Sequence, residues 1–337
     1  MTDQPVPVAV LGTGSWGTTF AAVLANAGAQ VRMWGRSAPT CEAITATHRN
    51  ERYLPGIDLP ASITASTDLA QVVPGAKVVA VALPSQIVRG VLGDVAGLLE
   101  PDAVVVSLMK GIELGSGERM SEVLAEALGI AAGRVAVVSG PNLAREIAVH
   151  QPTATVVAAS DPRTADLVAQ VCANGYFRPY TNGDVVGVEL GGAVKNVIAL
   201  AVGMAQGAGF GDNTTATIIT RGLAETTRLG VALGAQPETF AGLAGMGDLV
   251  ATCASRLSRN NTLGRHVGRG MSLAEATAAT GGTAEGVKSC SAVLEVAAAH
   301  GVDMPITQAV AAVLHDGLPV GAMTEALLSR PRKAEGA

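Results

Sequence analysis

Aromatic and charged side chains are scarce in this sequence. Only 3% of its 337 residues are aromatic and 15% are charged, whereas 48% are hydrophobic. A core with so few aromatics must be filled by Ala, Val, Leu and Ile, as in tightly packed α/β and helical proteins. The net charge is −5, and no basic cluster with interleaved aromatics occurs. We therefore expect no nucleic-acid partner.

Cysteine is also scarce, and its spacing does not indicate disulfide bonds. The four cysteines form no C-x-x-C pair, and the five histidines are scattered. These patterns predict no disulfide framework and no metal site, and they are typical of reduced thiols in a cytoplasmic protein. The N-terminus, Met1 to Pro5, lacks the basic region of a secretory signal.

One long apolar stretch, Leu190 to Ala205, resembles a membrane span by composition. Lys195 and Asn196 lie at its centre, and it contains several glycines. A charge at that depth is costly in a bilayer. We expect a buried helix of a soluble domain, with no membrane insertion.

The first strong motif is a G-x-G-x-x-G turn. The apolar run Val8 to Leu11 ends in Gly12, Gly14 and Gly17, and an alanine-rich helical stretch follows. In a nucleotide-binding turn the first glycine permits a sharp bend, the second lets backbone approach a pyrophosphate, and the third permits close helix–strand packing. The alternative is a plain glycine turn.

Strand and helix signals divide the chain into two parts. Strands are predicted at 7–11, 30–35, 77–83, 103–109, 134–139 and 154–159, with helices such as 14–27, 87–99 and 121–128 between them. Later helices are predicted at 185–206, 214–233, 237–243, 272–278, 287–300, 304–314 and 322–328. We therefore predict an α/β protein with a Rossmann-type doubly wound parallel sheet in residues 1–185. An all-helical domain spans 186–330 and a tail 331–337, and ligands bind at the carboxyl ends of the strands.

The end of the second strand bears on the cofactor. An acidic residue there would bind the ribose 2′-hydroxyl of NAD, but the sequence reads Trp34-Gly35-Arg36-Ser37. An arginine can pair with a 2′-phosphate, which favours NADP(H) or the use of both cofactors. The alternative is a solvated surface arginine.

Two lysines are candidates for catalysis. Lys195 is the only cation in the long apolar helix, and desolvation lowers the pKa of a buried lysine toward the range useful for proton transfer. A structural lysine that pairs with Glu189 or reaches the surface is the alternative. Lys110 follows a strand and can polarise a carbonyl or hold the substrate, or it simply ends the strand.

Polar clusters supply the remaining candidates. Asp248 follows two glycines and can orient Lys195 or cap a helix, and Thr252 shares its face if a helix begins there. Ser258-Arg259-Asn260 suits a phosphate, or is an ordinary polar turn. Glu285 can contact the cofactor or cap a helix. The turn from Ser139 to Ala144 closes another strand on the ligand-binding edge.

These clusters together resemble the bacterial glycerol-3-phosphate dehydrogenase family over nearly the whole chain. The shared motifs, in the family's order, are GTGSWGT, MKGIE, SGP, GGAVKN, GxGDL, SRN and AEGV. The resemblance implies NAD(P)H-dependent reduction of dihydroxyacetone phosphate to sn-glycerol 3-phosphate, which supplies phospholipid synthesis. It makes Lys195 the proton donor and acceptor, with Asp248 and Thr252 ordering the site.

The resemblance also implies the binding residues. Cofactor contacts fall on Ser15, Trp16, Arg36, Tyr53, Lys110, Ala144, Arg259, Thr283 and Glu285. Substrate contacts fall on Lys110, Gly140, Asn142, Lys195, Asp248, Ser258, Arg259 and Asn260. Asn142 departs from the family, which more often has Ser or Thr there, although its amide can still bond a substrate.

Three further expectations complete the sequence analysis. The apolar helical domain predicts a homodimer. A β-hydroxyacid dehydrogenase with a carboxylate substrate is the nearest rival, because it also carries a Gly-Gly…Lys-x-Asn helix. A non-catalytic NADP(H) sensor on the same fold is the alternative outside enzymes, and it would not need Lys195.

Overall fold

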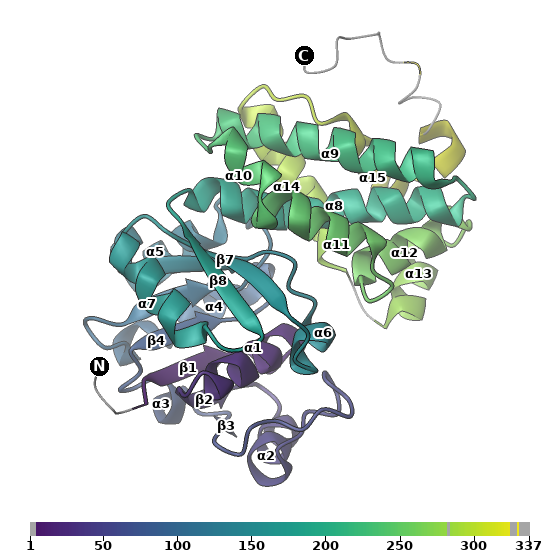
Figure 1. Ribbon diagram of the computed structural model, residues 1–337. Coiled ribbons are helices and arrows are strands. Elements are labelled where there is room, and N and C mark those ends of the chain that lie inside the picture. Colours follow the sequence, from purple (N-terminus) through teal and green to yellow (C-terminus); the bar gives the residue numbers. More distant parts are fainter. Residues whose placement is uncertain (1–4, 282–283, 324–328, 330–337) are drawn as a thin grey trace.

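The computed structural model describes residues 5–281, 284–323 and 329. A sheet with helices on its two faces forms the first part of the chain, and a bundle of helices forms the second (Figure 1). Because the family of α/β folds buries its strands on both faces, the Val-rich runs of the sequence form the interior of this sheet.

A single eight-stranded sheet has the order β3-β2-β1-β4-β5-β6-β7-β8. The strands are β1 (Pro7–Leu11), β2 (Gln30–Trp34), β3 (Thr64–Ser66), β4 (Val78–Val81), β5 (Val104–Ser107), β6 (Val135–Ser139), β7 (Thr153–Ala159) and β8 (Phe177–Asn182). The first six strands are parallel, in the order of dinucleotide-binding sheets. The carboxyl ends of β1 and β4 therefore flank the point where the strand order reverses, which is where such sheets bind ligands.

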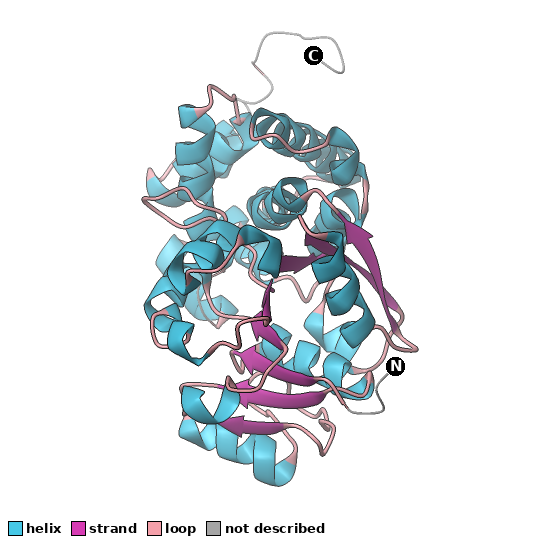
Figure 2. Cartoon of the chain, turned by 90° about the vertical axis from the view of Figure 1, so that its left-hand side faces the viewer, coloured by secondary structure: helices cyan, strands magenta, loops and turns pink. Residues whose placement is uncertain are grey.

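Alternating side chains of β1 enter two separate cores, one on each face of the sheet. Val8 and Val10 pack in the core that includes Phe20, whereas Ala9 and Leu11 pack in the core that includes Val88. The helices of this part are α1 (Ser15–Asn26), α2 (Ala38–Thr47), α3 (Leu69–Val72), α4 (Val88–Leu92), α5 (Met120–Leu128), α6 (Ala144–Ala148) and α7 (Pro162–Cys172). Short 3₁₀ turns are η1 (Ser85–Ile87), η2 (Ala96–Leu98) and η3 (Ala132–Arg134). Figure 2 shows the strands stacked into one twisted sheet between these helices.

The helical part is organised around α8 (Val185–Gly207). This helix is long and apolar enough to cross a membrane, but 89% of its most apolar stretch is buried inside the protein, as in a core helix. Around it lie α9 (Asp212–Ala232), α10 (Pro237–Ala241), the π-helical turn η4 (Leu243–Gly247), α11 (Asp248–Ala254), α12 (Arg259–Gly268), α13 (Leu273–Thr280), α14 (Glu285–Ala299) and α15 (Pro305–His315). The predicted fold class is confirmed.

Several local predictions were wrong. The run 154–159 is a strand but lies antiparallel to β6, and β8 follows it, so the sheet is not wholly parallel. The short β3 and the polar edge strand β8 lack the apolar runs that would reveal them. The predicted helix 87–99 is broken into η1, α4 and η2, because three glycines within it weaken helix formation. Most of the predicted helix 322–328, and all of the tail 331–337, lie outside the described residues.

Candidate active site

The G-x-G-x-x-G turn has the geometry that its glycines predict. Gly12 has a φ of 123°, and an added Cβ would lie 2.4 Å from the carbonyl oxygen of Ala82, beyond the end of β4. A Cβ on Gly17 would lie 2.2 Å from the Gly12 oxygen. At Gly14, by contrast, nothing lies within 4 Å of an added Cβ. The turn is therefore packed at its ends and open at the position where backbone would approach a pyrophosphate.

The N-terminus of α1 is free to bind an anion. Gly14 is its N-cap, no side chain caps it and its first turn carries no acidic residue. Its backbone N–H groups and the positive end of its dipole thus face the open space at Gly14. These features fit the pyrophosphate of NAD(P)(H).

A segment between α2 and β3 is tied to this turn. The Ser15 hydroxyl donates to the Tyr53 carbonyl oxygen at 2.7 Å. The buried Asn50 amide donates to the Thr13 carbonyl oxygen and to the Thr18 hydroxyl, both at 2.8 Å. Tyr53 is therefore held beside the turn, with its side chain partly exposed, at a position where the resemblance implies a cofactor contact.

The other predicted cofactor residues lie around the same edge. Trp16 packs on Phe20 with ring centroids 5.6 Å apart, and its buried Nε1 has no partner among the described residues. Arg36 follows β2, is exposed and forms no ion pair within the described ranges. Ala144 begins α6, and its carbonyl oxygen accepts a bond from the Thr19 hydroxyl at 3.2 Å. Thr283 lies outside the described residues.

Asp248 connects the two candidate lysines. One carboxylate oxygen pairs with Lys195 Nζ, and the other accepts a bond from Lys110 Nζ at 2.6 Å. Lys195 Nζ also donates to the Thr252 hydroxyl at 2.7 Å, and Lys110 Nζ donates to the Gly140 carbonyl oxygen at 3.0 Å. Asp248 is 1% exposed and Lys195 is 8% exposed. The structure therefore gathers residues from four distant segments into one buried polar cluster.

Glycines let the elements that carry this cluster approach one another. A Cβ on Gly191 of α8 would lie 2.5 Å from the Ala244 carbonyl oxygen in η4, the turn that leads into Asp248. A Cβ on Gly192 would lie 2.7 Å from the Ser139 Oγ at the end of β6 and 3.4 Å from the Cγ of Lys110. The Gly-Gly pair thus brings α8 against both the sheet and the start of α11.

Burial sets the protonation of Lys195. Desolvation lowers its pKa to about 8, and the charge of Lys110 acts in the same direction, whereas the Asp248 carboxylate opposes the shift. A group that gains and loses its proton near neutral pH is suited to general acid–base catalysis. Burial also raises the pKa of Glu285, against the opposing charges of Arg259, Lys110 and Lys195. Glu285 therefore lies within the electrostatic range of the cluster.

The alternative in which Lys195 pairs with Glu189 is wrong. The Glu189 carboxylate accepts bonds from Arg119 at 2.8 Å and from the backbone N–H and hydroxyl of Ser121 at 2.8 and 2.6 Å. The alternative of Asp248 as an N-cap is also wrong, because it is the first residue of α11 and both its oxygens bond lysines. Thr252 lies one turn further along this helix.

The Ser258-Arg259-Asn260 cluster begins a helix, so its interpretation as a polar turn is wrong. Ser258 caps α12 by accepting a bond from Asn261 N at 3.2 Å, and Arg259 is exposed at its first residue. The Asn260 side chain bridges two other helices, since its Nδ2 donates to Asn196 Oδ1 at 2.9 Å and its Oδ1 accepts from Gly286 N at 3.0 Å. An arginine beside the N-terminus of a helix is suited to a phosphate.

The turn after β6 lies beside Lys110. Gly140 has a φ of 144°, and its carbonyl oxygen accepts bonds from Lys110 Nζ and from Asn142 N. The Asn142 side chain donates to the Thr155 hydroxyl in β7 at 3.0 Å. Thr155 was missed by the sequence analysis, as were Asn50 and Asn196. No local pattern marks them, because their partners lie at least 13 residues away.

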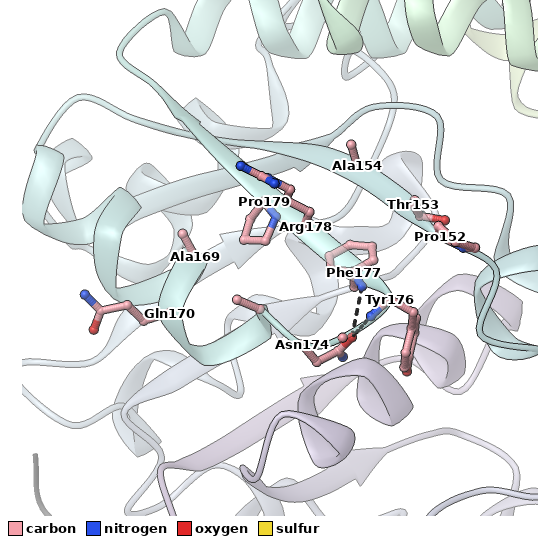
Figure 3. A pocket seen from close by; sticks show the side chains of 12 residues that line it. Pro152, Thr153, Ala154, Ala169, Gln170, Asn174, Tyr176, Phe177, Arg178 and Pro179 are labelled. Carbon is pink, nitrogen blue, oxygen red and sulfur yellow. Dashed lines mark hydrogen bonds between the residues drawn. The ribbon is translucent and has the colours of Figure 1, made fainter.

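A pocket at the edge of the sheet lies away from this cluster. It has a volume of about 720 Å³ and is formed by β7, β8 and α7 at the edge of the sheet (Figure 3). Asn174 is one of its lining residues, and its Oδ1 accepts bonds from the backbone N–H groups of Tyr176 and Phe177. None of the predicted site residues lines it. This pocket is therefore separate from the candidate active site.

The chain matches the two family models of NAD-dependent glycerol-3-phosphate dehydrogenase, the N-terminal one over residues 7–165 and the C-terminal one over 184–325. It is 60% identical to glycerol-3-phosphate dehydrogenase [NAD(P)+] of Streptomyces griseus, covering 98% of this chain and 99% of the relative. The corresponding protein of Thermobifida fusca is 58% identical, over 97% and 98% of the two chains.

Solved structures agree with these relatives. The crystal structure of glycerol-3-phosphate dehydrogenase from Coxiella burnetii superposes with a TM-score of 0.92 at 36% identity, covering 97% of this chain and 99% of that one. The yeast glycerol-3-phosphate dehydrogenase superposes with a TM-score of 0.83 at 29% identity, over 96% and 99%. Matches of this extent exclude the two alternative assignments, a β-hydroxyacid dehydrogenase and a non-catalytic NADP(H) sensor.

Proposed function

Since the chain belongs to the NAD-dependent glycerol-3-phosphate dehydrogenase family, we propose that it works in the direction of dihydroxyacetone phosphate reduction and supplies sn-glycerol 3-phosphate for phospholipid synthesis. It is an NAD(P)-dependent oxidoreductase, and the Gly12–Gly17 turn fits this cofactor as described above. When bound, NAD(P)H supplies the hydride that reduces the ketone carbon.

The Lys195 ammonium supplies the proton. As the carbonyl oxygen gains negative charge it must be protonated, and a buried lysine with a pKa of about 8 can give up its proton near neutral pH. Asp248 and Thr252 fix the position of its Nζ by bonds to a carboxylate oxygen and a hydroxyl. After the transfer, these bonds hold the neutral amine until it regains a proton from solvent.

Lys110 polarises the carbonyl group and holds the substrate. Its Nζ is fixed by Asp248 and by the Gly140 carbonyl oxygen, and it adds a second positive charge on the side where negative charge develops. The buried Asp248 carboxylate offsets one of the two positive charges and contacts both ammonium groups, so that both lysines can lie close together in a site with little water.

The N-terminus of α12 binds the substrate phosphate. Arg259 provides a charged donor, the Ser258 hydroxyl proton is free to donate because its oxygen acts as the helix cap, and Asn260 keeps one amide hydrogen beyond its bond to Asn196. Binding energy from this phosphate, remote from the carbonyl, positions the ketone for reaction. Asn142 is a further substrate contact.

Cofactor specificity depends on Arg36. Its exposed side chain can pair with the 2′-phosphate of NADP(H) and stack on the adenine. Ser15, Trp16, Tyr53, Ala144 and Glu285 complete the cofactor contacts, together with Lys110, Arg259 and Thr283. Because NAD lacks the 2′-phosphate, this arginine favours NADP(H) or the use of both cofactors.

The shared ion pairing of Asp248 with both lysines is the observation that carries this proposal. A substrate panel tests it: dihydroxyacetone phosphate, unphosphorylated dihydroxyacetone and a 2-keto acid are each supplied with NADPH and with NADH. Turnover of the phosphate ester alone, with sn-glycerol 3-phosphate as the product, is the expected result. Turnover of the keto acid, or of none of the three, would overturn the assignment.

The remaining proposals concern the assembly and its setting. We propose a homodimer that works in the cytoplasm, where its four free and buried cysteines stay reduced. Residues 1–185 act as the cofactor domain and residues 186–330 as the substrate domain. Size-exclusion chromatography with light scattering tests the dimer, and a monomeric mass would reject it.

A further inference from the structure

Glu189 joins the central helix of the bundle, α8, to α5, a helix that packs on the sheet. Its Oε1 accepts a bond from the Ser121 backbone N–H at 2.8 Å, and its Oε2 accepts bonds from the Ser121 hydroxyl at 2.6 Å and from Arg119 at 2.8 Å. Ser121 is the second residue of α5, so the carboxylate lies at the positive end of that helix dipole. Burial raises the pKa of Glu189, and the Arg119 charge and both Ser121 donors oppose that rise. The two parts of the protein are therefore fastened together at Glu189.

The segment between β5 and α5 carries Lys110 near its start and Arg119 at its end. It is folded back on itself, since the Glu113 backbone N–H donates to the Glu118 carbonyl oxygen at 2.9 Å. Arg89 of α4 bonds the carboxylates of Glu113 and Glu118 at 2.9 and 2.6 Å. The two ends of the segment are therefore held in one arrangement on the surface of the sheet.

The helix α8 meets the two ends of this segment at neighbouring positions. Arg119 bonds Glu189, and an added Cβ on Gly192 would lie 3.4 Å from the Cγ of Lys110. Residues three apart on a helix are neighbours on its surface. Lys195 follows three residues after Gly192. The bonds at Glu189 thus fix how closely the part of α8 that carries Lys195 approaches Lys110.

Lys110 is the charged member of the catalytic cluster that the sheet contributes. Lys195 and Asp248 belong to α8 and α11 of the bundle, and Lys110 reaches Asp248 from the other part at 2.6 Å. If α8 moved away from the sheet, Lys195 would keep Asp248, because both residues move with the bundle. Lys110 would lose it. The bond between Lys110 and Asp248 therefore depends on the anchor at Glu189.

We propose that Glu189 is a positioning residue for the reaction: its bonds to the N-terminus of α5 hold α8 where Lys110 and Lys195 can share Asp248. This role rests on the proposed function and adds a residue to it. Glu189 has no hydrogen bond to the catalytic cluster among the described residues, so it acts through the placement of α8.

The pH profile of Glu189→Ala tests this role. Desolvation and the Lys110 charge lower the pKa of Lys195, whereas Asp248 raises it. A displaced α8 admits water, removes Lys110 and leaves Asp248 to Lys195 alone, and all three changes raise that pKa. We expect kcat for dihydroxyacetone phosphate reduction to fall by roughly tenfold to a hundredfold at pH 7. Its decline with rising pH should begin roughly half a unit to one unit higher than in the wild-type enzyme.

The direction of the shift separates this role from two others. Loss of the Glu189 charge by itself favours the neutral form of a nearby lysine, so a direct electrostatic effect would move the decline to lower pH. A loss of folded enzyme would lower kcat at every pH and leave the decline where it is. The other titratable groups whose charges act with Lys195 are unchanged in the variant: Asp248, Lys110, Cys253 and Glu285.

Two further variants complete the comparison. Ser121→Ala removes one donor to Glu189 without a change of charge, so it should give a smaller shift in the same direction. Combined with Glu189→Ala it should add nothing, because the two residues act through one contact. Glu225→Ala is the matched control. Glu225 is also a buried carboxylate that accepts bonds from the N-terminus of a helix, α15, and its loss should leave the pH of the decline unchanged.

The outcomes are distinguishable. A decline at the wild-type pH or at a lower pH in Glu189→Ala would overturn the role of Glu189, and so would additive effects of Glu189→Ala and Ser121→Ala. If Glu189→Ala does not fold, Ser121→Ala decides alone, and an unmoved decline in that variant would overturn the role. If the wild-type enzyme does not reduce dihydroxyacetone phosphate, the proposed function itself fails.

Discussion

Lys195 and Asp248 form an ion pair in which both side chains are buried, although 53 residues separate them in the sequence. The second carboxylate oxygen of Asp248 bonds Lys110, so one negative charge serves two positive ones. A net positive charge in a buried site favours an oxyanion, which is what forms at the carbonyl oxygen during reduction. The packing of α8, which carries Lys195, against α11, which carries Asp248, therefore creates the charge arrangement that ketone reduction needs.

The pH dependence of the reaction follows from Lys195. Its pKa is lowered to about 8, so the protonated form needed for ketone reduction predominates below that pH and is lost above it. We expect kcat for reduction to be level at lower pH and to fall above about pH 8, while kcat for alcohol oxidation rises over the same range. Stopped-flow turnover at saturating substrate measures both limbs.

The Asp248→Asn variant provides the control for this profile. The Asp248 charge raises the pKa of Lys195, so its removal lowers that pKa further. The descending limb for reduction should then begin at a lower pH, in whatever activity remains. If kcat for reduction instead falls at the same pH as in the wild-type enzyme, a group other than Lys195 is titrating.

Arg36→Ala tests cofactor discrimination. The loss of a charge-assisted contact to the 2′-phosphate should weaken NADPH binding by roughly tenfold to a hundredfold, while NADH binding changes little. Fluorescence titration of each cofactor measures the two dissociation constants. Equal weakening of both would refute a role in recognising the 2′-phosphate.

Gly191→Ala tests the close approach of α8 to η4. An added Cβ would lie 2.5 Å from the Ala244 carbonyl oxygen, so we expect a loss of about 1–3 kcal/mol in the free energy of unfolding and a displaced Asp248. Gly90→Ala in α4 is the matched control, because nothing lies within 4 Å of its added Cβ. Urea denaturation compares them, and equal stability of the two variants would contradict the packing argument.

Glu225→Gln tests a buried carboxyl group that has no hydrogen bond to the catalytic cluster among the described residues. Glu225 accepts bonds from Ile306 N and from the N–H and hydroxyl of Thr307 at the start of α15, and burial raises its pKa from 4.5 to about 7. The folded state therefore binds this proton more tightly than the unfolded state does. The protonated Glu225 side chain therefore adds to the free energy of unfolding, fully below about pH 4.5. This stabilisation, about 3 kcal/mol, is lost as the pH rises through about 7.

The comparison of wild-type protein with Glu225→Gln isolates that contribution. Between pH 5 and pH 8 the free energy of unfolding of the wild-type protein should decrease more than that of the variant, because glutamine does not titrate. Urea denaturation at several pH values measures it. Parallel pH dependence of the two proteins would assign the effect to other groups.

The sequence predicted those elements whose geometry depends on residues close together in the chain. The Gly12–Gly17 turn and the long helix around Lys195 each show their geometry within a few residues. The rejected pairing of Lys195 with Glu189 could also have been excluded from the sequence. Six residues along a helix span about one and two-thirds turns, so the two side chains point to different faces. Asp248 and Thr252, four residues apart, do share a face.

Long-range contacts could not be predicted in this way. The direction of β7 depends on how the chain returns to the sheet, and this direction brings Thr155 to the turn that contains Gly140. Asn260 is the second residue of α12, a mostly polar helix whose two buried aliphatic residues, Leu263 and Val267, are too few to predict a helix there. Its bridge to Asn196 depends on the packing of α12 against α8. Such pairs become visible only when the fold is known.

Turnover and cofactor binding by Lys195→Ala test the central claim most directly. If Lys195 supplies the proton, the variant binds NADPH with wild-type affinity and loses roughly a hundredfold to ten-thousandfold in kcat for dihydroxyacetone phosphate reduction. Near-normal turnover would contradict the assignment of Lys195. Loss of NADPH binding together with turnover would show that the residue maintains the structure of the site and does not act in the chemistry.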